Sequence, residues 1–127
     1  MTRADFYLID KPRFRDDPLL LVCELVKKAY AAEQPTLILA RSTEQAEALD
    51  EKLWEFDDDS ITAVVIASPG VATADRPLVV NLRDECAEGA YERVLEVVAA
   101  DPAEREGSRV RWAEYKRRGF EVNKHDM

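Results

Sequence analysis

Short apolar segments alternate along this chain with longer segments whose apolar residues recur every three or four positions. A run of about four to eight apolar or β-branched residues between turn residues is typical of a buried strand. Apolar residues at helical spacing are typical of an amphipathic helix. Predicted strands cover residues 4–10, 35–40, 61–68, 77–82 and 120–123, and predicted helices cover residues 17–34, 42–54, 89–100 and 101–118.

Residues that start and stop helices support these boundaries. Asp17 precedes a proline, Ser42 precedes the second helix, and Asp101-Pro102-Ala103-Glu104 is a capping box that contains a proline. Gly119 can adopt the left-handed conformation that ends a helix. The last four residues, 124–127, are predicted to form a loose tail.

The alternation of strands and helices predicts an α/β fold. Nearly continuous apolar strands indicate a parallel-rich central sheet that is covered by helices on both faces, as in three-layer Rossmann-like domains. A length of 127 residues fits a single domain, 1–127, with its own core. Four glycines lie too far apart for a GxGxxG loop or a P-loop, so we expect no nucleotide site and no cofactor; they are Gly70, Gly89, Gly107 and Gly119.

The composition is that of a soluble globular protein, with 46% hydrophobic and 35% charged residues. No run of eighteen apolar residues is present, and the first ten residues do not resemble a secretory signal. We therefore expect a cytoplasmic protein that does not bind membranes. Cys23 and Cys86 are isolated in the sequence, and we interpret both as small buried hydrophobic residues.

Residues with catalytic or metal-binding chemistry are few. The only histidine, His125, lies in the predicted tail, where no scaffold would hold it near a substrate. Asp57, Asp58 and Asp59 could bind a divalent metal, but they lack the alternating ligands and glycine of a calcium loop, so a solvated loop is the simpler interpretation. We expect no enzymatic activity and no metal site.

Charge is distributed unevenly along the chain. The net charge of −8 argues against broad nucleic-acid binding, yet residues 105–124 hold seven basic residues against three acidic ones. On an unbroken helix, spacings of four, three and four residues place Arg105, Arg109, Trp112 and Lys116 in one row. Such a row suits a peptide with carboxylates and an aromatic side chain. The alternative is a solvated basic helix whose tryptophan packs inward.

Four motifs lie in a familiar order along the chain. FYLID is at residues 6–10, LVCEL at 21–25, LDEKLW at 49–54 and RWAEYKRRGFEVN at 111–123. With these motifs the chain resembles the chi subunit of bacterial DNA polymerase III, an accessory protein of the clamp loader. The resemblance implies a non-enzymatic subunit that binds the acidic, phenylalanine-ended tail of single-stranded DNA-binding protein (SSB) and also binds the psi subunit.

The resemblance also implies site residues. Its tail-binding patch falls on Val98, Arg105, Arg109, Trp112 and Lys116, and its partner surface falls on Trp54 and Ile61. The chain departs from the family pattern at Ala113, where lysine is frequent, and at Trp112, where tyrosine is frequent. It also departs after LDEKLW, where Ile61 replaces an aromatic residue. The second partner is therefore psi or a diverged clamp-loader protein, and we expect a monomer or a heterodimer.

Two other classes of function compete with this interpretation. The first is an enzyme or nucleotide-binding domain on the same fold, which the missing glycine loop disfavours. The second is a direct binder of single-stranded DNA that stacks bases on Trp54 and Trp112, which the net charge of −8 disfavours.

Overall fold

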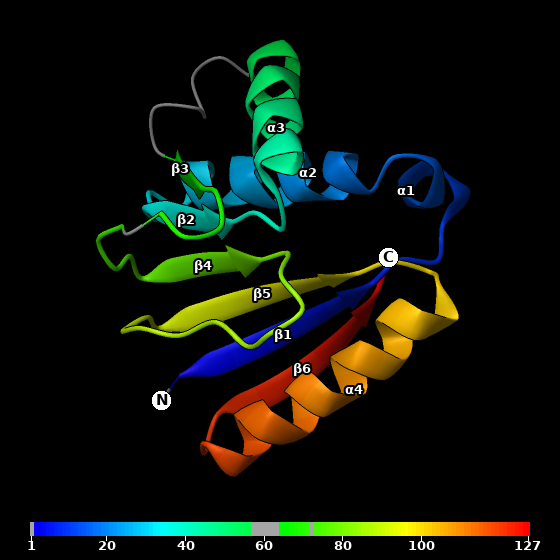
Figure 1. Cartoon of the computed structure of the whole chain (residues 1–127), viewed down its shortest axis with the longest axis vertical. Coiled ribbons are helices and arrows are strands. Elements are labelled where there is room, and N and C mark those ends of the chain that lie inside the picture. The colour runs from blue at the N-terminus through cyan, green and yellow to red at the C-terminus, as the bar shows by residue number, and fades with distance from the viewer. Residues whose placement is uncertain (1, 57–63, 72) are drawn as a thin grey trace.

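The computed structural model of the chain describes residues 2–56, 64–71 and 73–127 (Figure 1). It contains both strands and helices, and their order departs from the prediction at residues 89–100 and by one additional short helix. The strands are β1 (Arg3–Leu8), β2 (Thr36–Leu39), β3 (Val64–Ala67), β4 (Leu78–Asn81), β5 (Arg93–Val98) and β6 (Glu121–Asp126). The helices are α1 (Pro12–Asp16), α2 (Pro18–Ala31), α3 (Thr43–Phe56) and α4 (Pro102–Arg117).

The strands form one sheet in the order β3-β2-β4-β5-β1-β6, and every neighbouring pair is parallel. This confirms the predicted α/β fold with a parallel central sheet. The first and last strands of the chain are neighbours, with Arg3 opposite Glu121 and Leu8 opposite Asp126. Segments from the beginning and the end of the sequence therefore lie side by side at one edge of the sheet.

Each face of the sheet has its own core, so the fold has three layers. On one face, Leu21 of α2 and Leu49 of α3 belong to a cluster that includes Ile38 of β2. On the other face, Tyr115 of α4 packs in a cluster with Phe6 of β1. Figure 1 shows α2 and α3 beside β2 and β3, whereas α4 runs along β6 and β1. Helices therefore cover both faces, as predicted.

The predicted helix over residues 89–100 is wrong, because residues Arg93–Val98 form β5. This strand lies between β4 and β1, so both of its faces are buried and its apolar residues do not alternate. A valine-rich segment that is apolar on both faces fits helical and strand periodicity equally well. Gly89, with φ +107°, lies in the loop before β5.

The predicted loose tail at residues 124–127 is also wrong. Residues Glu121–Asp126 form β6, which pairs with β1. The Met127 amide donates to the Leu8 carbonyl at 2.8 Å, and the Met127 carbonyl accepts from the amide of Lys11 at 2.9 Å. The end of the chain is thus fixed by backbone hydrogen bonds.

Two predicted helix starts are confirmed here. The amide of Gln45 donates to Ser42 Oγ at 3.1 Å, at the start of α3. Pro18 begins α2, although the Asp17 carboxylate does not cap it and instead pairs with Lys52 Nζ at 2.5 Å. Helix α1 is short and was not predicted.

In the described ranges, no helix has the length and apolarity needed to cross a bilayer.

Candidate functional site

Helix α4 supplies most of the predicted site residues, and local chemistry sets its limits. The Asp101 carboxylate accepts from the Ala103 amide at 2.7 Å, and Pro102 occupies the first turn. Gly119 ends the helix with φ +88°. Between these residues the helix continues through Gly107 without a break. Arg105, Arg109, Trp112 and Lys116 therefore do lie on one continuous helix, as their spacing requires.

A pocket of about 360 Å³ lies between α4 and the strands β1 and β6. We call it the basic pocket. It combines apolar side chains, a hydroxyl and basic side chains from three elements that are far apart in the sequence. Its lining residues are Phe6, Leu8, Arg105, Ser108, Arg109, Trp112 and Lys124.

One wall of the basic pocket is aromatic. The rings of Trp112 and Phe6 have centroids 5.1 Å apart and are tilted by 52°. Trp112 is only half-buried, so it packs on Phe6 and still borders the pocket. Lys116 is not in the lining, but its Nζ lies 6.0 Å from the centroid of the Trp112 ring. This arrangement offers an apolar surface with a cation beside it, which suits an aromatic side chain.

The cations of the pocket differ in how they are held. Arg105 Nη2 donates to the Ile9 carbonyl at 2.9 Å, which fixes this guanidinium at the carboxyl end of β1. Arg109 and Lys124 are exposed, and neither side chain has a hydrogen bond or ion pair to another residue in the described ranges. Two positive charges in the pocket are therefore available to an anionic ligand.

Neighbouring arginines near the end of α4 are engaged elsewhere. Arg117 donates to both carboxylate oxygens of Glu114, at 2.6 and 3.0 Å. Arg118 pairs with Glu114 at 3.2 Å and with Glu88 at 2.7 Å. The bonds from Arg117 and Arg118 lower the pKa of Glu114. The arginines at positions 105–118 thus divide into a group that lines the pocket and a group that binds acidic residues of the protein itself.

Val98, which the resemblance assigned to the same patch, lies on β5 with its side chain fully buried. It belongs to the core beneath α4, next to Leu8 in strand register. A fully buried side chain does not contact a ligand in this state. Val98 therefore supports the pocket only through packing.

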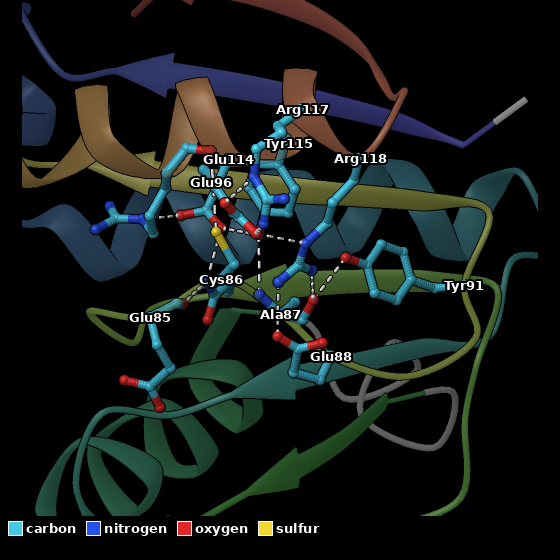
Figure 2. A network of polar contacts seen from close by, with 12 residues as sticks. Glu85, Cys86, Ala87, Glu88, Tyr91, Glu96, Glu114, Tyr115, Arg117 and Arg118 are labelled. Carbon is cyan, nitrogen blue, oxygen red and sulfur yellow. Dashed lines mark hydrogen bonds and ion pairs between the residues drawn. The ribbon is translucent and has the colours of Figure 1, made fainter.

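A buried polar network holds α4 against the sheet (Figure 2). Glu96 of β5 is fully buried, and its carboxylate accepts from Arg111 Nε at 2.8 Å and from Tyr115 Oη at 2.7 Å. Asn81 Nδ2 donates to the same carboxylate at 2.6 Å. Burial raises the pKa of Glu96 above its ordinary 4.5, although Arg111, Asn81 and Tyr115 favour the ionised form. The network fixes the rotation of the helix, and therefore which residues face the pocket.

Tyr115 also ties the loop after β4 to this network. Its hydroxyl accepts from the Ala87 amide at 2.9 Å while donating to Glu96. Burial, followed by the nearby Glu96 charge, raises the pKa of Tyr115. Figure 2 shows Tyr115 and Glu96 close together, with Ala87 on the loop beside them. The phenol remains protonated and donates to Glu96.

Four lining residues were not predicted from the sequence: Phe6, Leu8, Ser108 and Lys124. Strand register explains the three that lie outside α4. Phe6 is opposite Lys124 and Leu8 is opposite Asp126, so alternate residues of β1 and β6 point to the face that α4 covers. Recognising β6 as a strand that pairs with β1 would have placed Lys124 beside Phe6. Residues 121–126 are almost all polar, so the sequence itself carried no signal for this strand.

The predicted partner surface is described only in part. Trp54, near the end of α3, is 54% exposed. Ile61 and the candidate metal ligands Asp57, Asp58 and Asp59 lie outside the described residues. Among the residues that are described, no three acidic, histidine or cysteine side chains form a group that could hold a metal ion.

His125 is not the incidental tail residue that the sequence suggested. It stacks on Tyr7 of β1 with ring centroids 4.8 Å apart, and its Nε2 lies 3.1 Å from Asp5 Oδ1. Burial raises the pKa of Asp5, but bonds from His125, Arg93 and Arg3 lower it more, so the pKa lies below its ordinary 3.8. This cluster joins β6 to β1 on the face opposite α4.

The two cysteines behave differently. Cys23 is fully buried, as predicted, and burial raises the pKa of its thiol to about 11. Cys86 is only half-buried, and its Sγ lies 3.9 Å from the Arg111 carbonyl. Burial raises the pKa of this thiol as well. A raised pKa favours the protonated form of both thiols at neutral pH, and this form is the weaker nucleophile.

Comparisons with known proteins point to one family. The family model described as "DNA polymerase III chi subunit, HolC" matches residues 1–123. A curated protein of Pseudomonas aeruginosa named DNA polymerase III subunit chi is 27% identical over 143 aligned positions, which cover 100% of this chain and 98% of that protein. Both findings agree with the resemblance carried by the four sequence motifs.

Proposed function

The chain belongs to the family of DNA polymerase III chi subunits, which are non-catalytic accessory subunits in replication. From this premise we propose that it links SSB to the clamp loader. In this proposal the basic pocket binds the acidic C-terminal tail of SSB. A second surface around Trp54 binds psi or a diverged clamp-loader protein. The protein would act in the cytoplasm, where the replicating chromosome lies.

The composition of the basic pocket is the observation that carries the proposal. Phe6, Leu8 and Trp112 form an apolar surface on which an aromatic side chain can pack. Arg109 and Lys124 stand on either side of it, and both lack a partner in the described ranges. A cavity with an apolar floor and unpaired cations suits a peptide that ends in an aromatic residue and carries carboxylates.

Charge distribution favours an acidic peptide over a nucleic acid. The whole chain carries a net charge of −8, which repels an extended phosphate backbone. A short acidic tail can meet the local excess of basic residues at positions 105–124 without lying across the acidic remainder. The pocket volume of about 360 Å³ also fits a single side chain with its neighbouring groups.

Exposure of Trp54 supports the second surface. A tryptophan that is 54% exposed leaves much of its large apolar area in water. Partner proteins often bury aromatic residues of this kind at the centre of an interface. Trp54 lies on α3, which packs on the face opposite α4. Two partners could therefore bind at the same time.

Two peptides test the proposal directly. The first has several aspartates and a terminal phenylalanine, and the second lacks only that phenylalanine. We expect calorimetric titration to show binding of the first peptide and at least about tenfold weaker binding of the second, because burial of one aromatic side chain contributes that much. Equal binding of both peptides would show a diffuse charge effect and would contradict the proposal.

A matched pair of variants tests the location. Arg109→Ala and Arg117→Ala remove the same charge from the same helix, but only Arg109 lines the basic pocket. Loss of a charge-assisted hydrogen bond weakens binding by about tenfold or more, so the affinity of Arg109→Ala for the peptide should fall by at least that factor. The affinity of Arg117→Ala should fall little, since this side chain binds Glu114, and the small effect should vanish in added salt. Equal losses of affinity in the two variants would place the peptide elsewhere.

A further inference from the structure

A second groove borders α4 on the side of the loop that joins β4 to β5. Its volume is about 920 Å³, against about 360 Å³ for the basic pocket, so it has room for several side chains of a ligand. Of the described residues, only Arg109 lines both. We call this surface the Val110 groove. The lining residues that decide its chemistry are Asp84, Glu85, Glu88, Glu106, Val110 and Ala113.

The apolar part of the Val110 groove lies on α4. Val110 is 70% exposed, and Ala113, three residues further along the helix, is exposed as well. A lone exposed valine is ordinary on a protein surface. Here, however, Val110 lies in a groove beside a second apolar side chain, and Ala113 stands where lysine is frequent in the chi family. The two side chains therefore form an apolar patch that no charge interrupts.

The loop wall of the groove is acidic. Residues 84–88 read DECAE, and the side chains of Asp84 and Glu88 are each 77% exposed. The Glu85 carboxylate has no hydrogen bond or ion pair in the described ranges, and Figure 2 shows it turned away from the polar network. Glu106, on the helix wall, is exposed and likewise has no side-chain partner among the described residues. Two carboxylates on opposite walls are therefore available to cations.

The arginines of the groove do not cancel these two charges. Arg117 binds Glu114 at 2.6 Å and Arg118 binds Glu88 at 2.7 Å. Arg111 is buried against Glu96, as described above. Among the arginines of the lining, only Arg109 lacks a partner in the described ranges. Together with the net charge of −8 for the whole chain, the unpaired carboxylates favour a cationic ligand.

The loop wall is held in place by bonds within the protein. Arg111 Nη1 donates to the Asp84 carbonyl at 3.1 Å, and Asn81 Nδ2 donates to the Glu85 carbonyl at 2.8 Å. The Ala87 amide donates to Tyr115 Oη at 2.9 Å. A wall that is already fixed loses little conformational freedom when a partner docks against it.

We propose that the Val110 groove docks a basic amphipathic segment of a protein partner. An apolar side chain of that segment packs on Val110 and Ala113, and lysine or arginine residues on either side of it bind Glu85 and Glu106. A nucleic acid or an acidic peptide meets repulsion from the same carboxylates. The groove lies on α4, whereas Trp54 lies on α3 on the other face of the sheet, so this surface is separate from both surfaces of the proposed function.

The test uses two labelled peptides of one composition. The first, of about 15 residues, forms a helix with leucines on one face and arginines on either side of them; the second has the same residues in scrambled order. Fluorescence anisotropy measures the affinity of each peptide for the full-length protein. The amphipathic peptide should bind at least about fivefold more tightly than the scrambled one, because only it presents its apolar groups to Val110 together.

Variants locate the peptide. Val110→Ser should weaken binding of the amphipathic peptide about fivefold, and Val110→Leu should retain it. Glu85→Gln combined with Glu106→Gln should weaken binding about tenfold through loss of charge-assisted bonds.

The matched control is Glu44→Gln combined with Glu51→Gln on α3. It removes the same charge from exposed sites and should change the affinity less than about twofold. Val110→Ser should unfold near the wild-type temperature, since the side chain is 70% exposed, and should bind the acidic, phenylalanine-ended peptide as the wild-type protein does.

Three results would overturn the inference, and none of them bears on the basic pocket. The first is no binding of the amphipathic peptide by the wild-type protein. The second is equal binding of the amphipathic and scrambled peptides, or equal losses in the two double variants, because attraction to the acidic protein as a whole would then suffice. The third is self-association in analytical ultracentrifugation that Val110→Ser abolishes, which would make a second copy of the chain the occupant of the groove.

Discussion

Replacing Glu96 by glutamine should destabilise the protein more than any other single change to the polar network under α4. Glu96 and Arg111 form an ion pair at 2.8 Å, and their side chains are only 0% and 6% exposed. The substitution keeps the side-chain size but removes the charge that compensates the guanidinium. Arginine does not lose its proton in proteins, so a buried charge would remain without a counter-ion.

The size of this effect follows from burial. Removing one partner of a buried ion pair costs about 3–5 kcal/mol of unfolding free energy. Arg111→Met should cost less, because the Glu96 left behind can take up a proton and retain the bonds from Asn81 and Tyr115. The double variant, Glu96→Gln with Arg111→Met, should be more stable than Glu96→Gln alone, since it contains no uncompensated charge.

The sign of the pH dependence gives a second check on Arg111→Met. Arg111 lowers the pKa of Glu96, so without it that pKa should lie further above the ordinary 4.5. An acid with a higher pKa in the folded than in the unfolded state loses stability as pH rises through that interval. As pH falls from 7 toward 5, Arg111→Met should therefore recover stability relative to the wild-type protein.

Urea unfolding followed by far-ultraviolet circular dichroism measures these differences, provided that the dependence on urea concentration keeps one slope. Glu114→Gln is the control, because it breaks pairs with Arg117 and Arg118 at the surface of the same helix and should have a much smaller effect. If Glu96→Gln were no more destabilising than Glu114→Gln, the network would not hold α4 in place, and the argument from burial would be wrong.

Three further predictions concern other parts of the molecule. Burial raises the pKa of Asp5, but bonds from His125 and Arg93 lower it more, so the stability of the wild-type protein should fall as pH drops below 3.8. Thermal unfolding at pH 6 and pH 3 measures this loss, and Asp5→Asn should lose less stability between the two pH values because it lacks the contribution of the Asp5 carboxylate. Trp54 is 54% exposed, so Trp54→Ala should unfold near the wild-type temperature and still bind the tail peptide, but it should no longer co-elute with the clamp-loader partner. Co-elution of the folded variant would show that Trp54 does not contact this partner. Trp112→Ala should lower the free energy of unfolding by about 2 kcal/mol, as expected for a half-buried aromatic residue. In calorimetry Trp112→Ala should also lose the preference for a peptide with a terminal phenylalanine, whereas Trp112→Phe should retain that preference.

Local signals in the sequence were sufficient for the helices that have caps. Asp101 and Pro102 at the start of α4 and Gly119 at its end have the roles that their residue types suggest. Each of these signals acts within one turn of the helix, so no knowledge of distant contacts is needed. For the same reason, the spacing of Arg105, Arg109 and Trp112 was enough to bring these three side chains to one pocket.

Elements stabilised by distant contacts were missed. The sequence of β6, Glu121–Asp126, is polar because the strand lies at the edge of the sheet, and only its pairing with β1 makes it a strand. The sequence of β5 was assigned to a helix because burial on both faces removes the alternation that distinguishes a strand. Lys124 and Phe6 were absent from the predicted site for this reason, since they meet only after residues 118 positions apart pair in the sheet.

The placement of arginines explains why the basic pocket, rather than the usual crevice of this fold, presents cations to a ligand. In parallel α/β sheets, ligands often bind beyond the carboxyl ends of the strands. Here Arg83 reaches across those ends and donates to the carbonyls of Ala40 and Ser68, at 2.9 and 3.1 Å. Arg41 lies beside it and binds both carboxylate oxygens of Glu104, at 2.8 and 3.1 Å.

These bonds satisfy strand-end carbonyls and use both guanidiniums within the protein. An anion that entered this crevice would have to break existing bonds of Arg41 or Arg83 before it gained new ones. At the basic pocket, Arg109 and Lys124 have no partner to give up among the described residues, so their charge-assisted bonds to a peptide cost only the water that each group sheds. The difference in existing partners therefore supports the basic pocket, rather than the crevice, as the proposed site for an acidic ligand.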